Sequence, residues 1–393
     1  MTAPLIFFYH RLNCYSFNAL AGALDADPAL SNLPVDIALT AEKLRDLAIS
    51  HVGRHGRAIV ALSVLTCQLD ETRRLLGQLR SEFGSRVLIL AGGPHATACP
   101  DDILAAGAHV VFRGEAEITF PETLRRVLGG QDFQKVQSPA ERVDIEAFSS
   151  FSPKREMFGP IEITRGCAFA CSYCQTSGIF GIELRHRSIE SIVRQAETLR
   201  SVNRRVVRLL SPNAFSYGSA DGRQINLKAV RELLAALRSS LGAGTKIIFA
   251  HFPSEVRPEH VTPETLDLLE EFADNDEIVI GAQSGSQRML DICHRSHDVE
   301  SVLRAGTLAR KHGFKIIVDF IFGLPGETES DRSQTLAVLE ELVGMGARIH
   351  PHLFAPLPQT AFARAEPGSL PPEVMEALER FKSRRGIYGK LDP

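Results

Sequence analysis

Short apolar runs alternate with amphipathic stretches along the first third of the chain. Residues 69–83, for example, place apolar side chains three and four positions apart, which predicts a helix. Strands that alternate with helices predict a parallel, doubly wound sheet, an α/β fold of Rossmann-like type. In such a sheet the ligand crevice lies at the carboxyl ends of the strands. The apolar runs that predict strands are 5–10, 35–39, 58–64, 87–91 and 109–113.

The same alternation begins again at residue 161 and continues to about residue 360. Six strand–helix units of this kind predict a partial (β/α)6 barrel of the TIM type, with its chemistry in the loops at the carboxyl ends of the strands. The expected strands are 161–164, 205–210, 246–250, 278–281, 315–321 and 350–354. The expected helices lie near 188–200, 226–240, 263–273, 297–312 and 330–344.

These patterns divide the chain into four parts. Residues 1–135 form the expected Rossmann-like domain and residues 161–360 the expected barrel. Residues 136–160 contain prolines and serines without a sustained period, so we expect them to be a linker. Residues 361–393 carry one short helical pattern and then a tail.

Composition narrows the function classes. Of the 393 residues, 44% are hydrophobic and 23% are charged, as in an ordinary soluble globular protein. The net charge of −3 gives no electrostatic reason to expect nucleic acid as a partner. No uninterrupted apolar run reaches the roughly 18 residues of a membrane helix, and the N-terminus lacks a signal-peptide pattern. Seven cysteines without a disulfide framework favour a reducing compartment, and we expect the cytoplasm.

Three of these cysteines form a C-x3-C-x2-C segment, with Cys167, Cys171 and Cys174 at its ligand positions. No fourth cysteine or histidine follows closely, because the next candidates are His186 and Cys293. A structural zinc site uses four protein ligands in a closed tetrahedron. Three thiolates instead suit a cubane iron–sulfur cluster with one open iron, although a zinc site or unrelated thiols remain the alternative.

The segment resembles the cluster-binding motif of the radical S-adenosylmethionine (radical SAM) enzymes, and Tyr173 before the last cysteine adds to the resemblance. It implies that the three cysteines hold a [4Fe–4S] cluster whose open iron binds S-adenosylmethionine. One electron from the cluster then cleaves the sulfonium to a 5′-deoxyadenosyl radical. The electron is expected from a donor such as flavodoxin or ferredoxin.

Further barrel segments resemble elements of the same family. Gln283 and Ser284 end the fourth expected strand, where family members contact the ribose and carboxylate of S-adenosylmethionine. Gly323 and Gly326 follow the fifth, in a segment that lies against the adenine in the family. Glycine suits such an approach because it lacks a Cβ.

The end of the second barrel strand departs from the family. Ser211 and Asn213 stand where many members carry a glycine/glutamate motif. They could donate to the carboxylate of S-adenosylmethionine, or they could be ordinary turn residues.

The N-terminal domain resembles the cobalamin-binding domain that precedes the barrel in one class of radical SAM enzymes. In that class the corresponding loops cradle the cofactor. The resemblance implies that the cobalamin contacts in this chain are Ser63, Thr66, Gly92, Gly93, Pro94, His95, Gly114 and Glu115. The D-x-H-x-x-G motif that supplies an axial histidine in cobalamin mutases is absent. Both a cobalamin-binding domain and a domain that kept only the fold are compatible with this absence.

The first functional hypothesis is therefore a cobalamin-dependent radical SAM methyltransferase that acts on an unactivated carbon of a small-molecule or peptide substrate. A radical SAM enzyme of another reaction type, such as cyclisation, ring contraction or rearrangement, is the second. A non-catalytic iron–sulfur or zinc protein is the third.

Overall fold

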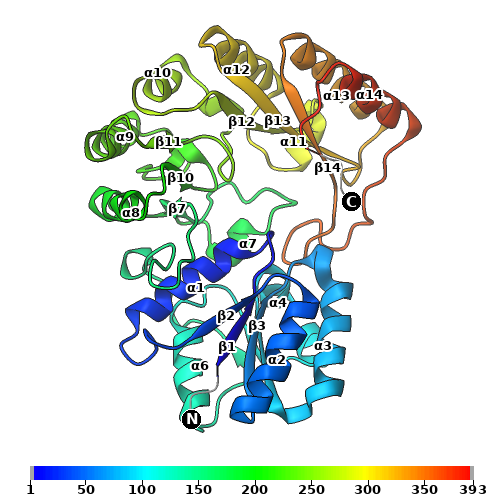
Figure 1. Ribbon diagram of the computed structural model, residues 1–393. Helices are drawn as coiled ribbons and strands as arrows, with labels where there is room; N and C mark the ends of the chain where they lie inside the picture. The colour runs from blue at the N-terminus through cyan, green and yellow to red at the C-terminus, as the bar shows by residue number, and fades with distance from the viewer. Residues whose placement is uncertain (1–3, 390–393) are drawn as a thin grey trace. The chain divides into compact units, whose positions relative to one another are not determined.

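The computed structural model describes residues 4–389. Contacts divide the chain into two compact units, Met1–Gly159 and Pro160–Pro393. The predicted fold class is confirmed, because the first unit holds a parallel sheet flanked by helices and the second a partial barrel (Figure 1).

The sheet of the first unit has the strand order β2-β1-β3-β4-β5-β6, and every neighbouring pair is parallel. Its central strand β3 is an unbroken, mostly buried apolar run, AIVALS, as expected for a strand covered on both faces. The strands are β1 (Leu5–Phe8), β2 (Val35–Ala38), β3 (Ala58–Ser63), β4 (Val87–Gly92), β5 (Val110–Phe112) and β6 (Val136–Gln137).

Helices cover both faces of this sheet (Figure 1). One face packs against α2 (Ala41–His55), α3 (Leu69–Phe83), α4 (Pro94–Ala98) and α5 (Pro100–Ala105). The other packs against α1 (Cys14–Ala26) and α6 (Thr119–Leu128). Local sequence determines where helix α2 begins. The side chain of Thr40 caps its N-terminus by accepting a hydrogen bond from Lys43 N at 3.2 Å.

The segment that was expected to be a linker contributes to the first unit. Val136–Gln137 pairs with β5, and a 3-10 turn, Ile145–Ala147, follows. The four-part division of the chain stays a prediction.

The second unit contains two three-stranded parallel sheets, β7-β10-β11 and β12-β13-β14. A parallel bridge between Val256 and Ile280 joins the segment after β11 to β12, which makes the six strands one continuous arc. The strands are β7 (Ile161–Glu162), β10 (Val206–Leu210), β11 (Lys246–Ile248), β12 (Glu277–Gln283), β13 (Lys315–Phe322) and β14 (Arg348–Leu353). A short antiparallel pair, β8 (Thr164–Arg165) with β9 (Arg185–His186), lies beside β7 in the chain.

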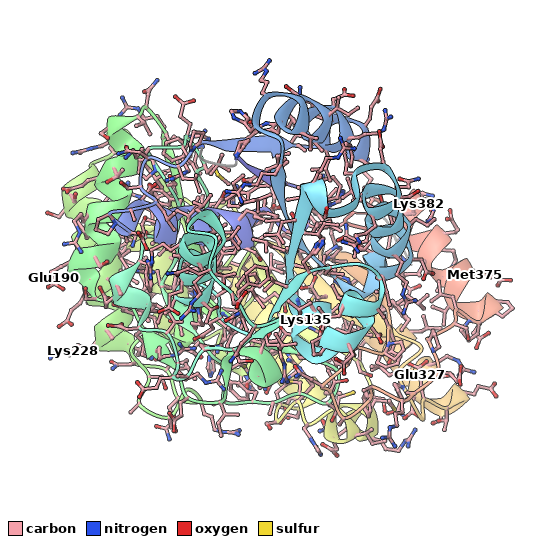
Figure 2. All side chains as sticks on the ribbon, turned by 90° about the horizontal axis from the view of Figure 1, so that it is seen from below. Lys135, Glu190, Lys228, Glu327, Met375 and Lys382 are labelled. Atoms are coloured by element: carbon pink, nitrogen blue, oxygen red, sulfur yellow. The ribbon has the colours of Figure 1, made fainter. Side chains whose placement is uncertain are left out.

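Helices line the outer side of this arc (Figure 1). They are α8 (Ile189–Ser201), α9 (Leu227–Leu241), α10 (Pro263–Phe272), α12 (Val299–Lys311) and α13 (Glu329–Gly344), with the short α7 (Thr176–Phe180) and α11 (Gln287–Ile292) in loops. Charged side chains such as Glu190 and Lys228 point outward from them (Figure 2). No helix within residues 4–389 has both the length and the hydrophobicity to cross a membrane.

The C-terminal segment packs onto the barrel. Helix α14 (Pro372–Ser383) leads to Ile387, which forms a parallel bridge with Ile349 of β14. Tyr388 then stacks on Phe252 with ring centroids 5.6 Å apart, so this segment joins β14 to the loop after β11.

Candidate active site

The cysteine loop begins directly after β8 and is held in shape by backbone geometry. Gly166 has φ +95°, and a Cβ there would lie 2.3 Å from Glu183 O, so only glycine fits. Cys167 N donates to Gly181 O at 3.0 Å and Cys174 N donates to Cys171 O at 3.0 Å. The loop is therefore bound to the segment that leads into β9.

The same loop is tied to two more segments of the second unit. Ser172 N donates to Cys293 O at 3.0 Å, and its hydroxyl donates to Ile292 O at 3.0 Å. Gln175 Nε2 donates to Pro358 O at 2.8 Å. These bonds preorganise the loop, so the thiols need little ordering when a ligand binds.

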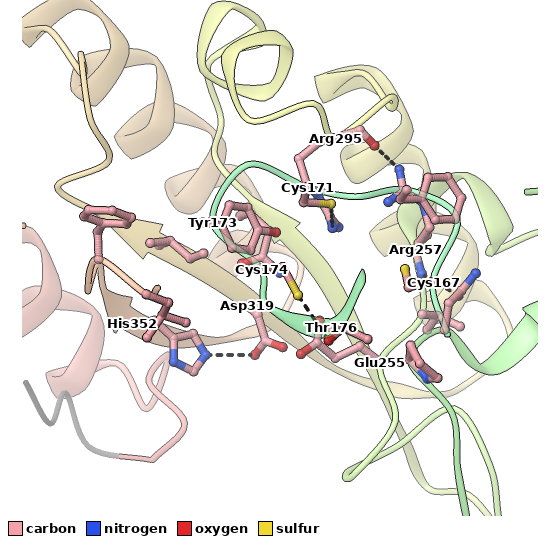
Figure 3. A pocket seen from close by; sticks show the side chains of 18 of the residues that line it. Cys167, Cys171, Tyr173, Cys174, Thr176, Glu255, Arg257, Arg295, Asp319 and His352 are labelled. Carbon is pink, nitrogen blue, oxygen red and sulfur yellow. Dashed lines mark hydrogen bonds and ion pairs between the residues drawn. The ribbon is translucent and has the colours of Figure 1, made fainter. Parts of the chain in front are cut away.

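A cavity of about 460 Å³ opens above this loop (Figure 3). All three cysteines of the motif line it, together with Tyr173 and Thr176 from the same loop. The remaining walls come from the carboxyl ends of the barrel strands, the position expected for the chemistry of such a fold. The residues of these walls that matter below are Ser211, Asn213, Glu255, Arg257, Gln283, Arg295, Asp319, Ile321, His352 and Phe354.

The sulfurs of the three motif cysteines are not gathered as in a closed single-ion site. Within the described residues, the three cysteine sulfurs do not form a group whose ligand atoms all lie within 4.8 Å of one another. Zinc binds thiolates at about 2.3 Å, which places two tetrahedral sulfur ligands roughly 3.8 Å apart. Burial raises the pKa of the Cys167 and Cys174 thiols, so a bound metal would have to stabilise their thiolates. The donor set fits a polynuclear iron–sulfur cluster better than a closed zinc site.

Two buried arginines flank the cysteine loop. Arg295, between α11 and α12, donates from Nη1 to Cys171 Sγ at 3.5 Å and from Nη2 to Gly281 O. The guanidinium carbon of Arg257 lies 3.5 Å from the ring centroid of Phe169, inside the loop. Buried guanidinium groups that face a cavity are suited to hold a carboxylate.

Gly281 of β12 makes room for three of the cavity side chains. A Cβ at this position would lie 2.6 Å from Glu255 Oε2, 3.0 Å from Gln283 Nε2 and 3.3 Å from Arg295 Nη2. The β12–β13 register shifts between Gly281 and Gln283, and Gln283 has φ +74°. Such a bulge changes the direction of a side chain, and here it accompanies the placement of Gln283 on the cavity.

An acidic group lies on another wall of the cavity. Asp319 Oδ1 accepts a hydrogen bond from His350 Nδ1 at 2.8 Å, and His352 Nε2 lies 3.7 Å from the same oxygen. The ligand atoms of Asp319, His350 and His352 all lie within 4.8 Å of one another, so these three residues could also bind a metal ion. Burial and the nearby charge of Asp319 raise the pKa of Glu255 to about 8.

This shift predicts a pH-dependent stability that Glu255→Gln removes. A glutamate in the unfolded chain titrates near pKa ~4.3. Between that value and about 8, the folded protein keeps a proton that the unfolded chain has released, so the free energy of unfolding falls as pH rises. We expect E255Q to exceed the wild type by on the order of 2 kcal/mol at pH 8 and to match it near pH 5.

The measurement is chemical denaturation of cluster-free protein at both pH values. Glu259→Gln is the control for the loss of a nearby carboxylate, because Glu259 Oε1 instead accepts a hydrogen bond from Arg257 Nε at 2.5 Å. Parallel pH profiles for E255Q and the wild type would contradict a protonated Glu255.

The structure brings most of the residues assigned by the barrel resemblance to one place. Cys167, Cys171, Cys174, Tyr173, Ser211, Asn213 and Gln283 all line the cavity. The amide of Asn213 is occupied by protein partners, because Nδ2 bonds Ser216 Oγ at 2.6 Å and lies 2.9 Å from His260 Nδ1, while Oδ1 accepts from Arg257 N at 3.3 Å. Asn213 therefore positions the Arg257 segment.

Three of the assigned residues lie away from the cavity lining. Ser284 accepts a hydrogen bond from Ser286 N at 3.1 Å and its hydroxyl lies 3.4 Å from Thr335 Oγ1 of α13. A Cβ on Gly323 would lie 2.7 Å from Gly368 Cα, so close packing of the C-terminal segment requires this glycine. Gly326 O accepts from Arg288 Nη2 at 2.6 Å.

The residues assigned to cobalamin lie at the carboxyl ends of β3, β4 and β5 in the first unit. Ser63 pairs with Gly92 in the sheet register, and the buried Ser63 hydroxyl has no hydrogen-bond partner among the described residues. Gly93 and Pro94 begin α4, and Thr66 Oγ1 lies 3.2 Å from His95 Nδ1. An unpaired buried hydroxyl beside two glycines fits the approach of a large polar ligand.

Two other residues of this set form hydrogen bonds within the protein. Gly114 N donates to Thr97 Oγ1 at 2.9 Å, and Glu115 Oε2 accepts from Val143 N at 2.7 Å. His95 is buried, and a ring nitrogen of His95, Cys99 Sγ and an Asp102 oxygen all lie within 4.8 Å of one another, a second group that could bind a metal ion.

Sequence reasoning missed Glu255, Arg257, Arg295 and Asp319. Each is an ordinary charged residue in its local segment. A signal was present for Asp319, near the end of a predicted strand, and for Glu255 and Arg257, shortly after another, because barrel side chains converge there. Arg295 lies beyond α11, far from the end of a predicted strand, and carried no such signal.

Family models match both units of the chain. Residues 161–339 match the radical SAM superfamily, and residues 16–124 match the B12 binding domain. The two matches overlap the barrel strands β7–β13 and the sheet of the first unit, respectively. The [4Fe–4S] cluster, S-adenosylmethionine and cobalamin are the cofactors that these two domains imply.

Curated relatives include an uncharacterised protein, MK0932, of Methanopyrus kandleri. It is 26% identical over 384 residues, which cover 85% of this chain and 72% of the relative. A tRNA-2-methylthio-N(6)-dimethylallyladenosine synthase of Halorhodospira halophila is 27% identical over 369 residues, covering 88% of this chain and 74% of the relative. The synthase of the same name from Moorella thermoacetica is 30% identical over 235 residues, but the match covers only half of its length.

Solved structures share the fold at low sequence identity. The methyltransferase TsrM from Kitasatospora setae, solved with tryptophan substrate and an S-adenosylmethionine analogue, has a TM-score of 0.68 and 16% identity, over 92% of this chain and 75% of TsrM. The cobalamin-dependent radical enzyme OxsB has a TM-score of 0.64 and 17% identity, over 86% of this chain and 52% of OxsB.

Proposed function

We propose that this chain, a radical SAM superfamily member with a B12-binding domain, is a cobalamin-dependent methyltransferase that acts on an unactivated carbon of a small-molecule or peptide substrate. The observation that carries the proposal is the convergence of three motif thiols on one cavity with two buried arginines and a glutamine. The methyltransferase TsrM, which shares the fold, supports methyl transfer as the reaction.

Cys167, Cys171 and Cys174 would hold the cluster. When bound, the [4Fe–4S] cluster supplies the electron that cleaves the sulfonium of S-adenosylmethionine. Arg295 and Gln283 face the same cavity and would hold the carboxylate and hydroxyl groups of that ligand. Ile321 and Phe354 form an apolar wall that excludes water from a reactive species.

Ser63, Thr66 and the Gly92–Gly93 turn would contact cobalamin in the first unit. When bound, cobalamin supplies a cobalt centre that can carry a methyl group. The Ser63 hydroxyl is the donor with no competing partner among the described residues, which makes it the first of these contacts to test.

The function is tested by the cofactors and products of anaerobically purified protein. We expect corrinoid absorbance, about four irons per chain, and the formation of 5′-deoxyadenosine, methionine and S-adenosylhomocysteine from S-adenosylmethionine and a low-potential reductant. Protein that contains iron and forms 5′-deoxyadenosine but never binds a corrinoid would support the second hypothesis, another radical reaction such as cyclisation. Protein that forms none of these three products would support a non-catalytic role.

Methylthiolation of tRNA is the second candidate, because several relatives with 27–30% identity carry that name. The prediction of no nucleic-acid partner stays a prediction. The two candidates are separated by the binding of bulk tRNA to the holoenzyme, measured at low and at physiological salt. Salt-resistant binding with formation of a methylthio-nucleoside would favour the synthase function.

A further inference from the structure

We infer that Arg295 raises the reduction potential of the iron–sulfur cluster through a charge-assisted hydrogen bond to the sulfur of Cys171. The inference rests on the cluster proposed for Cys167, Cys171 and Cys174. It adds a property of that cluster which the cysteine motif does not specify.

The guanidinium of Arg295 is fixed from two sides (Figure 3). Nη1 donates to Cys171 Sγ at 3.5 Å, and Nη2 donates to the main-chain oxygen of Gly281 on β12. The main-chain oxygen of Arg295 in turn accepts from Arg257 Nη2. A planar fork held in this way keeps one donor aimed at the sulfur, whereas a flexible lysine would not.

Arg295 stays charged although it is buried. A guanidinium is not deprotonated in proteins, so its positive charge remains beside the sulfur of Cys171. His297 is neutral beside it, since burial and the two arginines lower the pKa of this imidazole to about 2. Arg257 differs from Arg295 because its Nε pairs with Glu259 Oε1 at 2.5 Å and its plane covers Phe169.

A buried cation on a ligand sulfur favours the reduced cluster. Reduction adds one negative charge to the cluster, and that charge interacts more strongly with a nearby cation in a medium of low dielectric than in water. Hydrogen bonds to the sulfurs are among the features that set iron–sulfur potentials. Arg295 therefore makes the cluster easier to reduce, which helps a cellular donor deliver the electron.

The test is the midpoint potential of the reconstituted cluster, measured by EPR-monitored redox titration of full-length protein without S-adenosylmethionine. In Arg295→Gln the oxidised-to-reduced ratio at a fixed potential should rise about tenfold, which for a one-electron couple is about 59 mV. Arg295→Lys keeps the charge but cannot bond both Cys171 Sγ and Gly281 O, so its potential should lie between those of R295Q and the wild type.

Arg223→Gln is the matched control. Arg223 donates to Ala168 O at 2.8 Å from an exposed position beside the same loop, so its removal takes away one charge without touching a thiol. The cluster potential of R223Q should stay at the wild-type value, because solvent screens the charge of Arg223. An unchanged potential in R295Q would overturn the inference, and if R295Q fails to hold a cluster, an unchanged potential in R295K would do so. Wild-type protein without iron would instead refute the proposed cluster.

Discussion

Cys171→Ala should leave less than about a tenth of the wild-type iron–sulfur content after anaerobic reconstitution, and no detectable cleavage of S-adenosylmethionine. Cys171 lies at the centre of the motif, and its sulfur is the one contacted by Arg295 Nη1. A cubane held by three protein thiolates loses a third of its protein ligands when one is removed, and neither Cys167 nor Cys174 can replace it. Iron content, visible absorbance and 5′-deoxyadenosine formation measure the outcome.

Cys293→Ala is the matched control for this loss. Cys293 is buried in an apolar cluster with Met289, Leu324 and Phe354, and burial raises the pKa of its thiol to about 12. It should therefore stay a protonated packing residue, and its truncation should cost about 1–2 kcal/mol of stability while iron content remains at the wild-type level. The assignment of the three motif cysteines is contradicted if C293A loses its cluster and C171A keeps it.

Periodicity predicted the sheet of the first unit because parallel strands are buried on both faces and appear as unbroken apolar runs. The five strands expected in this unit differ from the observed ones only at their ends, as for β1, which stops at Phe8. β6 was missed because it has only two residues, Val136–Gln137, and no apolar run. The pair β8 and β9 was missed for the same reason, since two-residue strands carry no period.

The sequence revealed the site residues that lie close together in the chain and missed those that come together only in the folded barrel. The three cysteines and Tyr173 lie within one loop, so their spacing alone predicts a shared ligand. Arg295, Glu255 and Asp319 belong to three segments far apart in the chain and meet only when the barrel strands align. Glu255 and Arg295 both approach Gly281, and no single-segment pattern encodes that meeting. Gly323 was assigned from its motif to an adenine contact, but the clash of a Cβ with Gly368 shows that packing also requires it.

Gly93→Ala should destabilise the first unit by about 3 kcal/mol or more and strongly reduce its retention of corrinoid. Gly93 has φ +95°, and a Cβ would lie 2.6 Å from Val64 N and 2.7 Å from Ser63 Oγ. These neighbours cannot move easily, because Val64 N donates to Gly92 O at 2.8 Å and His95 N donates to Val64 O at 3.0 Å. The added methyl group would separate the two loops that end β3 and β4.

Gly77→Ala controls for a glycine substitution in the same unit. Gly77 lies on the exposed side of α3, and nothing lies within 4 Å of the place that a Cβ would take, so alanine should stabilise the helix by about 0.5–1 kcal/mol. Thermal denaturation, corrinoid absorbance and iron content separate the effects. Because the cysteines belong to the second unit, G93A should keep its iron while it loses the corrinoid. If G93A retains both its stability and its corrinoid, the loops that end β3 and β4 do not form the cobalamin contact, and the methyltransferase proposal loses its support from the first unit.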